Sequence, residues 1–166
     1  MTRQGDGYAP VTLRAVALVA ALALGACATG GLDTGGDVAV NAAPGSNEEF
    51  TLAVGRIVYF TENSADLSEI ARETLDKQAA WLSRYPRDQV RIDGFADEKG
   101  SAAVNMTLGQ RRADAVRAYL VSKGVSASAI TTKSLGNTQP VKRCNDISCW
   151  SQNRRAVTVV TNDASG

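Results

Sequence analysis

The chain has 166 residues, with 18 basic and 17 acidic side chains and no histidine. This balanced charge gives no indication of a nucleic-acid-binding surface, because such surfaces carry an excess of Lys and Arg. The lack of histidine removes the commonest general base and metal ligand, so few kinds of catalytic site remain available.

Residues 1–26 have the features of a secretory signal. The apolar run AVALVAALALGA is too short to cross a bilayer, and small residues follow it. The segment ends in Leu24-Gly25-Ala26-Cys27, which resembles the lipobox of bacterial lipoproteins. We expect Cys27 to become the first mature residue and to carry several acyl chains, and Ala28 after it favours the outer membrane. The alternative is an ordinary signal cleaved nearby, with Cys27 unmodified.

Residues 27–49 are expected to form the lipidated N-terminus and a flexible tether. The segment is rich in Gly, Ala, Asp and Asn and has no sustained apolar period. As a coil it would span on the order of 25 Å, and fully extended it would reach roughly 70 Å. Such a tether would hold a domain well away from a membrane surface.

Residues 50–163 are predicted to form one domain with its own core. β-Branched and aromatic residues predict the strands, and apolar residues at helical spacing, with Ile70 and Leu75 on the inner face of the first helix, predict the helices. Ser68 is the expected cap of the first helix, and Pro86 and Gly124 follow the two helix ends. The predicted strands are 53–60, 89–96, 129–136 and 154–161, the helices are 69–85 and 101–124, and 137–153 is a loop. The order β-α-β-α-β-β predicts an α+β fold, a mixed sheet with helices packed on one face.

Two cysteines, Cys144 and Cys149, remain once Cys27 is assigned to the lipid. An exported chain favours a disulfide between them, worth roughly 2 kcal/mol by loop-closure arithmetic. The alternative is a metal clip, which two thiols without histidine or a second cysteine pair form poorly.

Arg112 falls on the apolar side of the second predicted helix. On a helical wheel, Val104, Leu108 and Val116 lie in a broad apolar arc, and Arg112 projects within this arc. A core-facing arginine is costly unless its charge is met, either by a private ion pair to a carboxylate such as Asp97 or by a bound ligand. If Asp97 and Arg112 flank a cleft, the carboxylate would receive an ammonium and the guanidinium would receive a carboxylate. The pair would then suit a small zwitterion.

The stretch GFADEKGSAAVNMTLGQRRADAVRAYL, from Gly94 to Leu120, resembles the signature of the OmpA-like peptidoglycan-binding domain. The matching positions are Gly94, Asp97, Gly100, Asn105, Leu108, Arg112, Ala113 and Val116. NRRAVTVV, residues 153–160, resembles the last strand of that family. The resemblance spans residues 57–160.

The resemblance implies that the ligand is the meso-diaminopimelate side chain of the peptidoglycan stem peptide. Asp97 and Arg112 would hold its two charges, and no cofactor is implied. Asn105, Leu108 and the backbone at Gly100 would shape the slot, with Arg154 in support. Lipid-anchored members of the family act with the Tol system, through TolB and TolA, in envelope constriction at division.

The sequence departs from the family pattern at two positions. Asn63 stands where an aspartate is usual, so a charge is lost, and Phe95 stands where histidine is common. These changes leave open an alternative role as a scaffold for TolB-like partners with a weakened peptidoglycan site. An enzyme is not expected, because the sequence offers no nucleophile with a base, metal set or convincing carboxylate pair.

Overall fold

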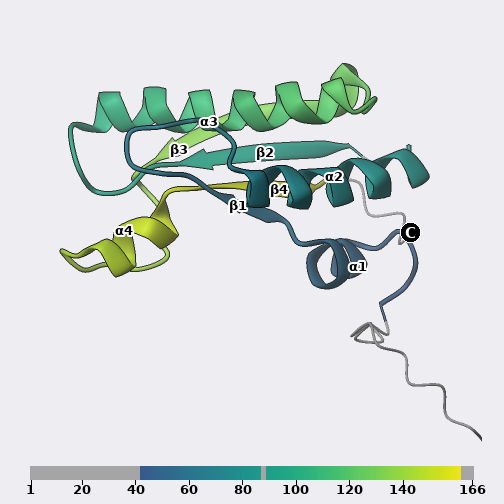
Figure 1. Cartoon of the computed structure of the whole chain (residues 1–166), viewed down its shortest axis with the longest axis horizontal. Helices are drawn as coiled ribbons and strands as arrows, with labels where there is room; N and C mark the ends of the chain where they lie inside the picture. The colour runs from purple at the N-terminus through teal and green to yellow at the C-terminus, as the bar shows by residue number, and fades with distance from the viewer. Residues whose placement is uncertain (1–41, 87–88, 162–166) are drawn as a thin grey trace, which may run out of the picture. The chain divides into compact units, whose positions relative to one another are not determined.

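The computed structural model describes residues 42–86 and 89–161, and these residues form the expected α+β domain (Figure 1). Four strands, β1 (Ile57–Tyr59), β2 (Val90–Phe95), β3 (Ile130–Gly136) and β4 (Arg155–Val160), form one sheet in the order β1-β4-β2-β3. β2 and β3 are parallel, and β4 runs antiparallel to both β1 and β2. The predicted mixed sheet is confirmed. The expected signal and lipidation site, residues 1–26 and Cys27, lie outside the described residues.

Two long helices, α2 (Glu69–Arg84) and α3 (Ala102–Ser122), pack against each other and against the sheet. Ser68 caps α2 as predicted, since its Oγ accepts a hydrogen bond from Ala71 N at 3.2 Å. Ser101 caps α3 in the same way, through Val104 N. No helix in the described part of the chain is both long and apolar enough to cross a membrane.

The core lies between these helices and one face of the sheet. Val90 and Ile92 of β2 and Val160 of β4 contribute to it, and the alternation of a strand explains why these residues share a face. Two predicted core positions are wrong. Ile70 is 76% exposed and Val104 is 55% exposed, because in each first turn the next residue, Ala71 or Asn105, is the one that faces the interior.

The end of the expected tether is folded. Ser46 caps a helical turn, α1 (Asn47–Glu49), and a π-helical turn, η1 (Phe50–Val54), follows in place of the predicted start of the first strand. Phe50 is fully buried beside Trp81, with ring centroids 4.9 Å apart. Trp81 Nε1 donates to Glu49 Oε2 at 2.8 Å, which fixes the turn on α2. Residues 42–55 with Trp81 and Tyr85 are called the tether end below.

The predicted loop 137–153 contains a helix, α4 (Ile147–Asn153). Asp146 caps it by accepting from Ser148 N at 2.7 Å, a local signal that the loop prediction overlooked. The predicted disulfide between Cys144 and Cys149 is confirmed, and it closes the segment that leads into this helix. A 3-10 turn, η2 (Ala127–Ala129), precedes β3.

Candidate functional site

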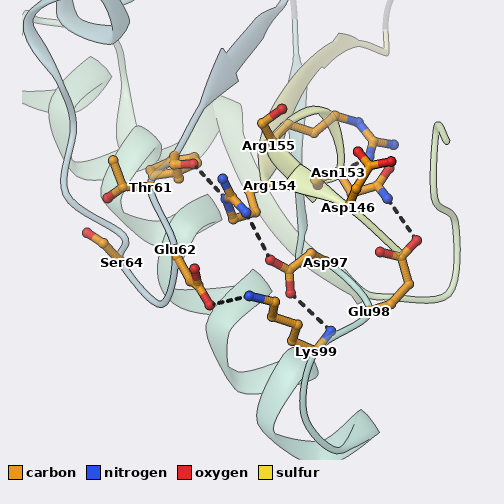
Figure 2. A network of polar contacts seen from close by, with 12 residues as sticks. Thr61, Glu62, Ser64, Asp97, Glu98, Lys99, Asp146, Asn153, Arg154 and Arg155 are labelled. Carbon is orange, nitrogen blue, oxygen red and sulfur yellow. Dashed lines mark hydrogen bonds and ion pairs between the residues drawn. The ribbon is translucent and has the colours of Figure 1, made fainter. Parts of the chain in front are cut away.

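Buried polar side chains gather where β2 ends. The turn after β1, the loop between β2 and α3, and the junction of α4 with β4 meet at this end of the sheet (Figure 2). Asp97, Asn105, Arg112, Asn153 and Arg154 are all at most 6% exposed. Polar groups at such depth need partners, so the contacts among them define what the site can bind.

A close approach of two backbones sets α3 over β2. A Cβ on Gly94 would overlap the carbonyl of Gly109, and a Cβ on Gly109 would lie 2.7 Å from Gly94 O. Because neither residue has a side chain, the helix lies directly on the strand. Arg112 follows one turn after Gly109, and its side chain reaches the end of β2, where Nη1 donates to Phe95 O.

Arg112 is completely buried and its guanidinium is held by backbone carbonyls. Nε donates to Ser64 O at 2.9 Å, Nη1 to Phe95 O at 2.7 Å and Nη2 to Thr61 O at 3.0 Å. Two of these carbonyls belong to the turn after β1, so Arg112 joins that turn to the end of β2. Among the described residues no ion pair links Arg112 to Asp97, so the private salt bridge considered above is not formed.

The charge on Arg112 is only partly compensated. Burial, with a smaller contribution from Arg154, lowers the pKa of the Arg112 guanidinium to about 10, and Asp97 acts in the opposite direction. This pKa is still well above 7, so the group keeps its charge at neutral pH. A buried cation that is met by neutral carbonyls retains a strong attraction for an anion.

Asp97 pairs with Arg154 instead. Its Oδ2 accepts from Arg154 Nη1 at 3.2 Å, and its Oδ1 accepts from Lys99 N at 3.1 Å (Figure 2). Arg154 also donates from Nε to Phe60 O at 3.2 Å. Asp97, Arg112 and Arg154, together with the turn of residues 60–64 that both arginines hold, are called the slot below.

The other expected ligand residues surround the slot in different ways. Asn105 is 1% exposed, and its Nδ2 is buried without a hydrogen-bond partner in the described part of the chain. Leu108 is buried one turn before Arg112. Gly100 has φ +86°, a conformation that favours glycine, and the space beside it is open. Asn63 is exposed at φ +53°, which asparagine tolerates better than most residues.

Asn153, which was not among the predicted site residues, joins three segments. Its side chain is fully buried, accepts from Val141 N at 2.8 Å and from Lys142 N at 3.2 Å, and donates to Glu98 Oε1 at 2.8 Å. The other carboxylate oxygen of Glu98 is buried without a partner in the described residues. No periodic pattern marks Asn153, because its partners lie in loops distant in sequence.

A second missed group lies across the front of the slot. Lys99 Nζ is 2.8 Å from Glu62 Oε1 and 4.1 Å from the centroid of the Trp150 ring. Both partners of this ion pair are nearly half exposed, so the contact is solvent-screened and can open at low cost.

Arg155, which alternation would direct outward from β4, is buried. Its guanidinium lies 3.7 Å from the Phe95 ring centroid and donates to Asn153 O and Gln139 O. Burial lowers the pKa of Arg155. The segment around α4 therefore covers part of the sheet face away from α2 and α3.

Comparisons with known proteins give matches over most of the folded domain. Residues 59–154 match the OmpA family. Over 153 residues the chain is 47% identical to the peptidoglycan-associated lipoprotein of Agrobacterium fabrum and 46% identical to that of Rhizobium meliloti, covering 87% of this chain and 85% of each relative. The crystal structure of the peptidoglycan-associated lipoprotein from Burkholderia pseudomallei is 37% identical, with a TM-score of 0.63, covering 64% of this chain and 90% of that one. The C-terminal domain of Helicobacter pylori MotB, 21% identical with a TM-score of 0.61, shares the fold, over 65% of this chain and 85% of that domain.

Proposed function

Because the chain belongs to the OmpA family, and within it to the non-enzymatic peptidoglycan-associated lipoproteins, we propose that it anchors the outer membrane to the cell wall without a covalent bond. The slot binds the free end of the diaminopimelate side chain in the peptidoglycan stem peptide. Asp97 receives the ammonium of that zwitterion and Arg112 receives its carboxylate.

One observation carries this proposal. Asp97 and Arg112 lie at one end of the sheet with opposite charges, and they are not paired with each other. Arg112 donates hydrogen bonds to three neutral backbone carbonyls. A carboxylate accepts more strongly than a carbonyl does, so a ligand can replace Thr61 O and Ser64 O at the guanidinium. The turn of residues 60–64 then moves aside as the ligand enters.

The position of the tether supports an anchoring role. In the tether end, residues 42–55 pack on Trp81 and Tyr85, near the C-terminus of α2, whereas the slot lies beyond the C-terminus of β2. These are opposite ends of the domain (Figure 1). A lipid at Cys27 would therefore pull from one end while peptidoglycan holds the other.

We further propose an outer-membrane location and action with the Tol system at division, with TolB and TolA as partners. The resemblance to lipid-anchored members of the family supports this assignment. The closed state of the slot favours a second candidate role, because Arg112 is fully buried and the neutral Asn63 offers a ligand no charge. In that role the protein is a scaffold for TolB-like partners with weak peptidoglycan affinity.

Sedimentation with isolated sacculi separates the two roles. The protein with Cys27→Ala, which lacks the expected lipid site, is compared with Arg112→Lys and Asp97→Asn in the same background. Lysine keeps the charge of Arg112 but loses the two-pronged donor, so we expect both variants to remain in the supernatant. Arg111→Lys is the matched control, because Arg111 is exposed on the same helix.

Thermal unfolding of each variant shows whether it is still folded under the assay conditions. Sedimentation of a folded Arg112→Lys variant to the same extent as the parent would contradict the peptidoglycan role of the slot. Capture of TolB by a parent protein that does not sediment with sacculi would favour the scaffold.

A further inference from the structure

A groove of about 400 Å³ lies beside the slot, between the turn after β1 and helix α4. One wall is formed by Tyr59, Thr61 and Asp66, and the other by Ser151 and Gln152. The residues expected to hold the diaminopimelate do not line this groove.

The groove and the slot share a wall. Phe60 and Thr61 line the groove, while Phe60 O accepts from Arg154 and Thr61 O accepts from Arg112. The same turn therefore borders both the groove and the slot. A ligand held by the slot has its remaining parts within reach of the groove.

The lining of the groove decides which part of peptidoglycan fits. Its lining contains one carboxylate, Asp66, and no cationic side chain. Arg155, the strand neighbour of Tyr59, is already engaged by Asn153 O, Gln139 O and the Phe95 ring. An acidic residue of a stem peptide would be repelled by Asp66 and would find no counter-charge.

The groove offers apolar and hydrogen-bonding groups that suit a neutral sugar. Tyr59 is 51% exposed, so its ring offers an apolar face to the C–H face of a pyranose. Asp66 and the Ser151 hydroxyl oxygen accept hydrogen bonds, and Gln152, which uses one amide hydrogen on Ser148 O, can still donate and accept, as sugar hydroxyls and acetamido groups require. An apolar wall with a few polar groups is the usual composition of a small-ligand site.

We propose that this groove is a second subsite, which binds an amino sugar of the glycan strand while the slot holds the diaminopimelate. This inference rests on the proposed function. With this subsite, the protein recognises a stem peptide that is still linked to glycan rather than the free peptide alone.

Calorimetry with three ligands tests the subsite, using the protein with Cys27→Ala. The ligands are the diaminopimelate-containing tripeptide, the same tripeptide on its N-acetylglucosaminyl–N-acetylmuramyl disaccharide, and the disaccharide alone. We expect the disaccharide tripeptide to bind about tenfold more tightly than the tripeptide, the equivalent of one good aromatic contact with its hydrogen bonds.

Two variants test which residues give the disaccharide tripeptide its higher affinity. Tyr59→Ala and Gln152→Ala should each reduce the advantage of the disaccharide tripeptide and leave the tripeptide affinity unchanged. Arg112→Lys should weaken both ligands and leave their ratio near that of the parent. Tyr59→Phe keeps the ring and should retain most of the gain.

The outcomes are distinguishable. Equal affinity of the parent for tripeptide and disaccharide tripeptide overturns the sugar subsite and leaves the slot intact. Retention of the full gain in Tyr59→Ala also overturns it. If the tripeptide fails to bind, the proposed function fails, and the subsite survives only if the disaccharide binds alone and Tyr59→Ala abolishes that binding.

Discussion

The two ends of the domain bury different kinds of side chain. At the tether end, Phe50 and Trp81 are almost completely buried, and the polar Trp81 Nε1 has a partner in Glu49. At the slot end, Arg112 and Asp97 are buried to a similar degree. The tether end is thus an ordinary apolar cluster, whereas the slot end places charges in the interior.

The two ends also differ in spare hydrogen-bonding capacity. Gln78 near the tether end donates to Gly55 O and accepts from Thr158, so its amide is satisfied on both sides. At the slot end, Asn105 Nδ2 and Glu98 Oε2 are buried without partners in the described residues. Unsatisfied buried groups cost stability, and a bound ligand can recover that cost. Substitutions at the two ends should therefore separate stability from binding.

The largest expected effect is at the tether end. Phe50→Ala removes a fully buried ring from between η1 and α2, and we expect the free energy of unfolding to fall by about 3–5 kcal/mol. Denaturant unfolding measures the loss. Leu52→Ala is the control, since Leu52 is 61% exposed and its loss should change little. Below the melting temperature, Phe50→Ala should sediment with sacculi as the parent does, and weaker sedimentation would show that the two ends are coupled.

Removal of the disulfide should affect both properties. Cys144→Ser with Cys149→Ser opens a loop of sequence separation 5, and the chain-entropy model gives a loss of about 2 kcal/mol. Because α4 carries Asn153 and leads directly into Arg154, the slot should also loosen and peptidoglycan binding should weaken.

Urea unfolding and sacculus sedimentation of this double variant measure the two effects separately. Loss of stability with unchanged binding would show that the slot does not depend on the position of α4. Ser126→Ala with Ser128→Ala, a pair of exposed hydroxyls in another loop, is the control.

The smallest expected effect concerns the ion pair across the slot. Lys99→Ala breaks the contact with Glu62, and an exposed pair of this kind contributes about 0.2–1 kcal/mol. We expect little change in melting temperature. The rate of ligand association, measured by stopped-flow fluorescence of the nearby Trp150, should rise because the front of the slot is open. A lower rate would show that Lys99 assists entry.

Much of the fold follows from sequence patterns. Alternating β-branched residues located β2, β3 and β4 to within one residue at either end, and Ser68 marked the start of α2. Helical periodicity also detected the anomaly at Arg112, because a charge within an apolar arc needs an explanation in the folded state.

The remaining features depend on contacts between distant segments. The α4 helix is only seven residues long and polar, so its periodicity is too weak to detect. The burial of Arg155 results from the 137–153 segment folding over Phe95, which no local pattern encodes. The pairing of Asp97 with Arg154 rather than with Arg112 joins residues 57 positions apart. The burial of Arg155 and the pairing of Asp97 therefore depend on tertiary contacts.

In the proposed function, Asp97 and Arg112 bind the two charges of one diaminopimelate. The most direct test compares the affinity of the protein for two stem tripeptides, one with meso-diaminopimelate and one with L-lysine at the same position. Lysine keeps the ammonium and lacks the distal carboxylate, so the contact to Arg112 is lost. We expect the lysine peptide to bind roughly 10–100-fold more weakly, the value of one charge-assisted hydrogen-bonded contact, and Arg112→Lys to abolish most of that difference. Equal affinity of the parent protein for the two peptides would contradict the account.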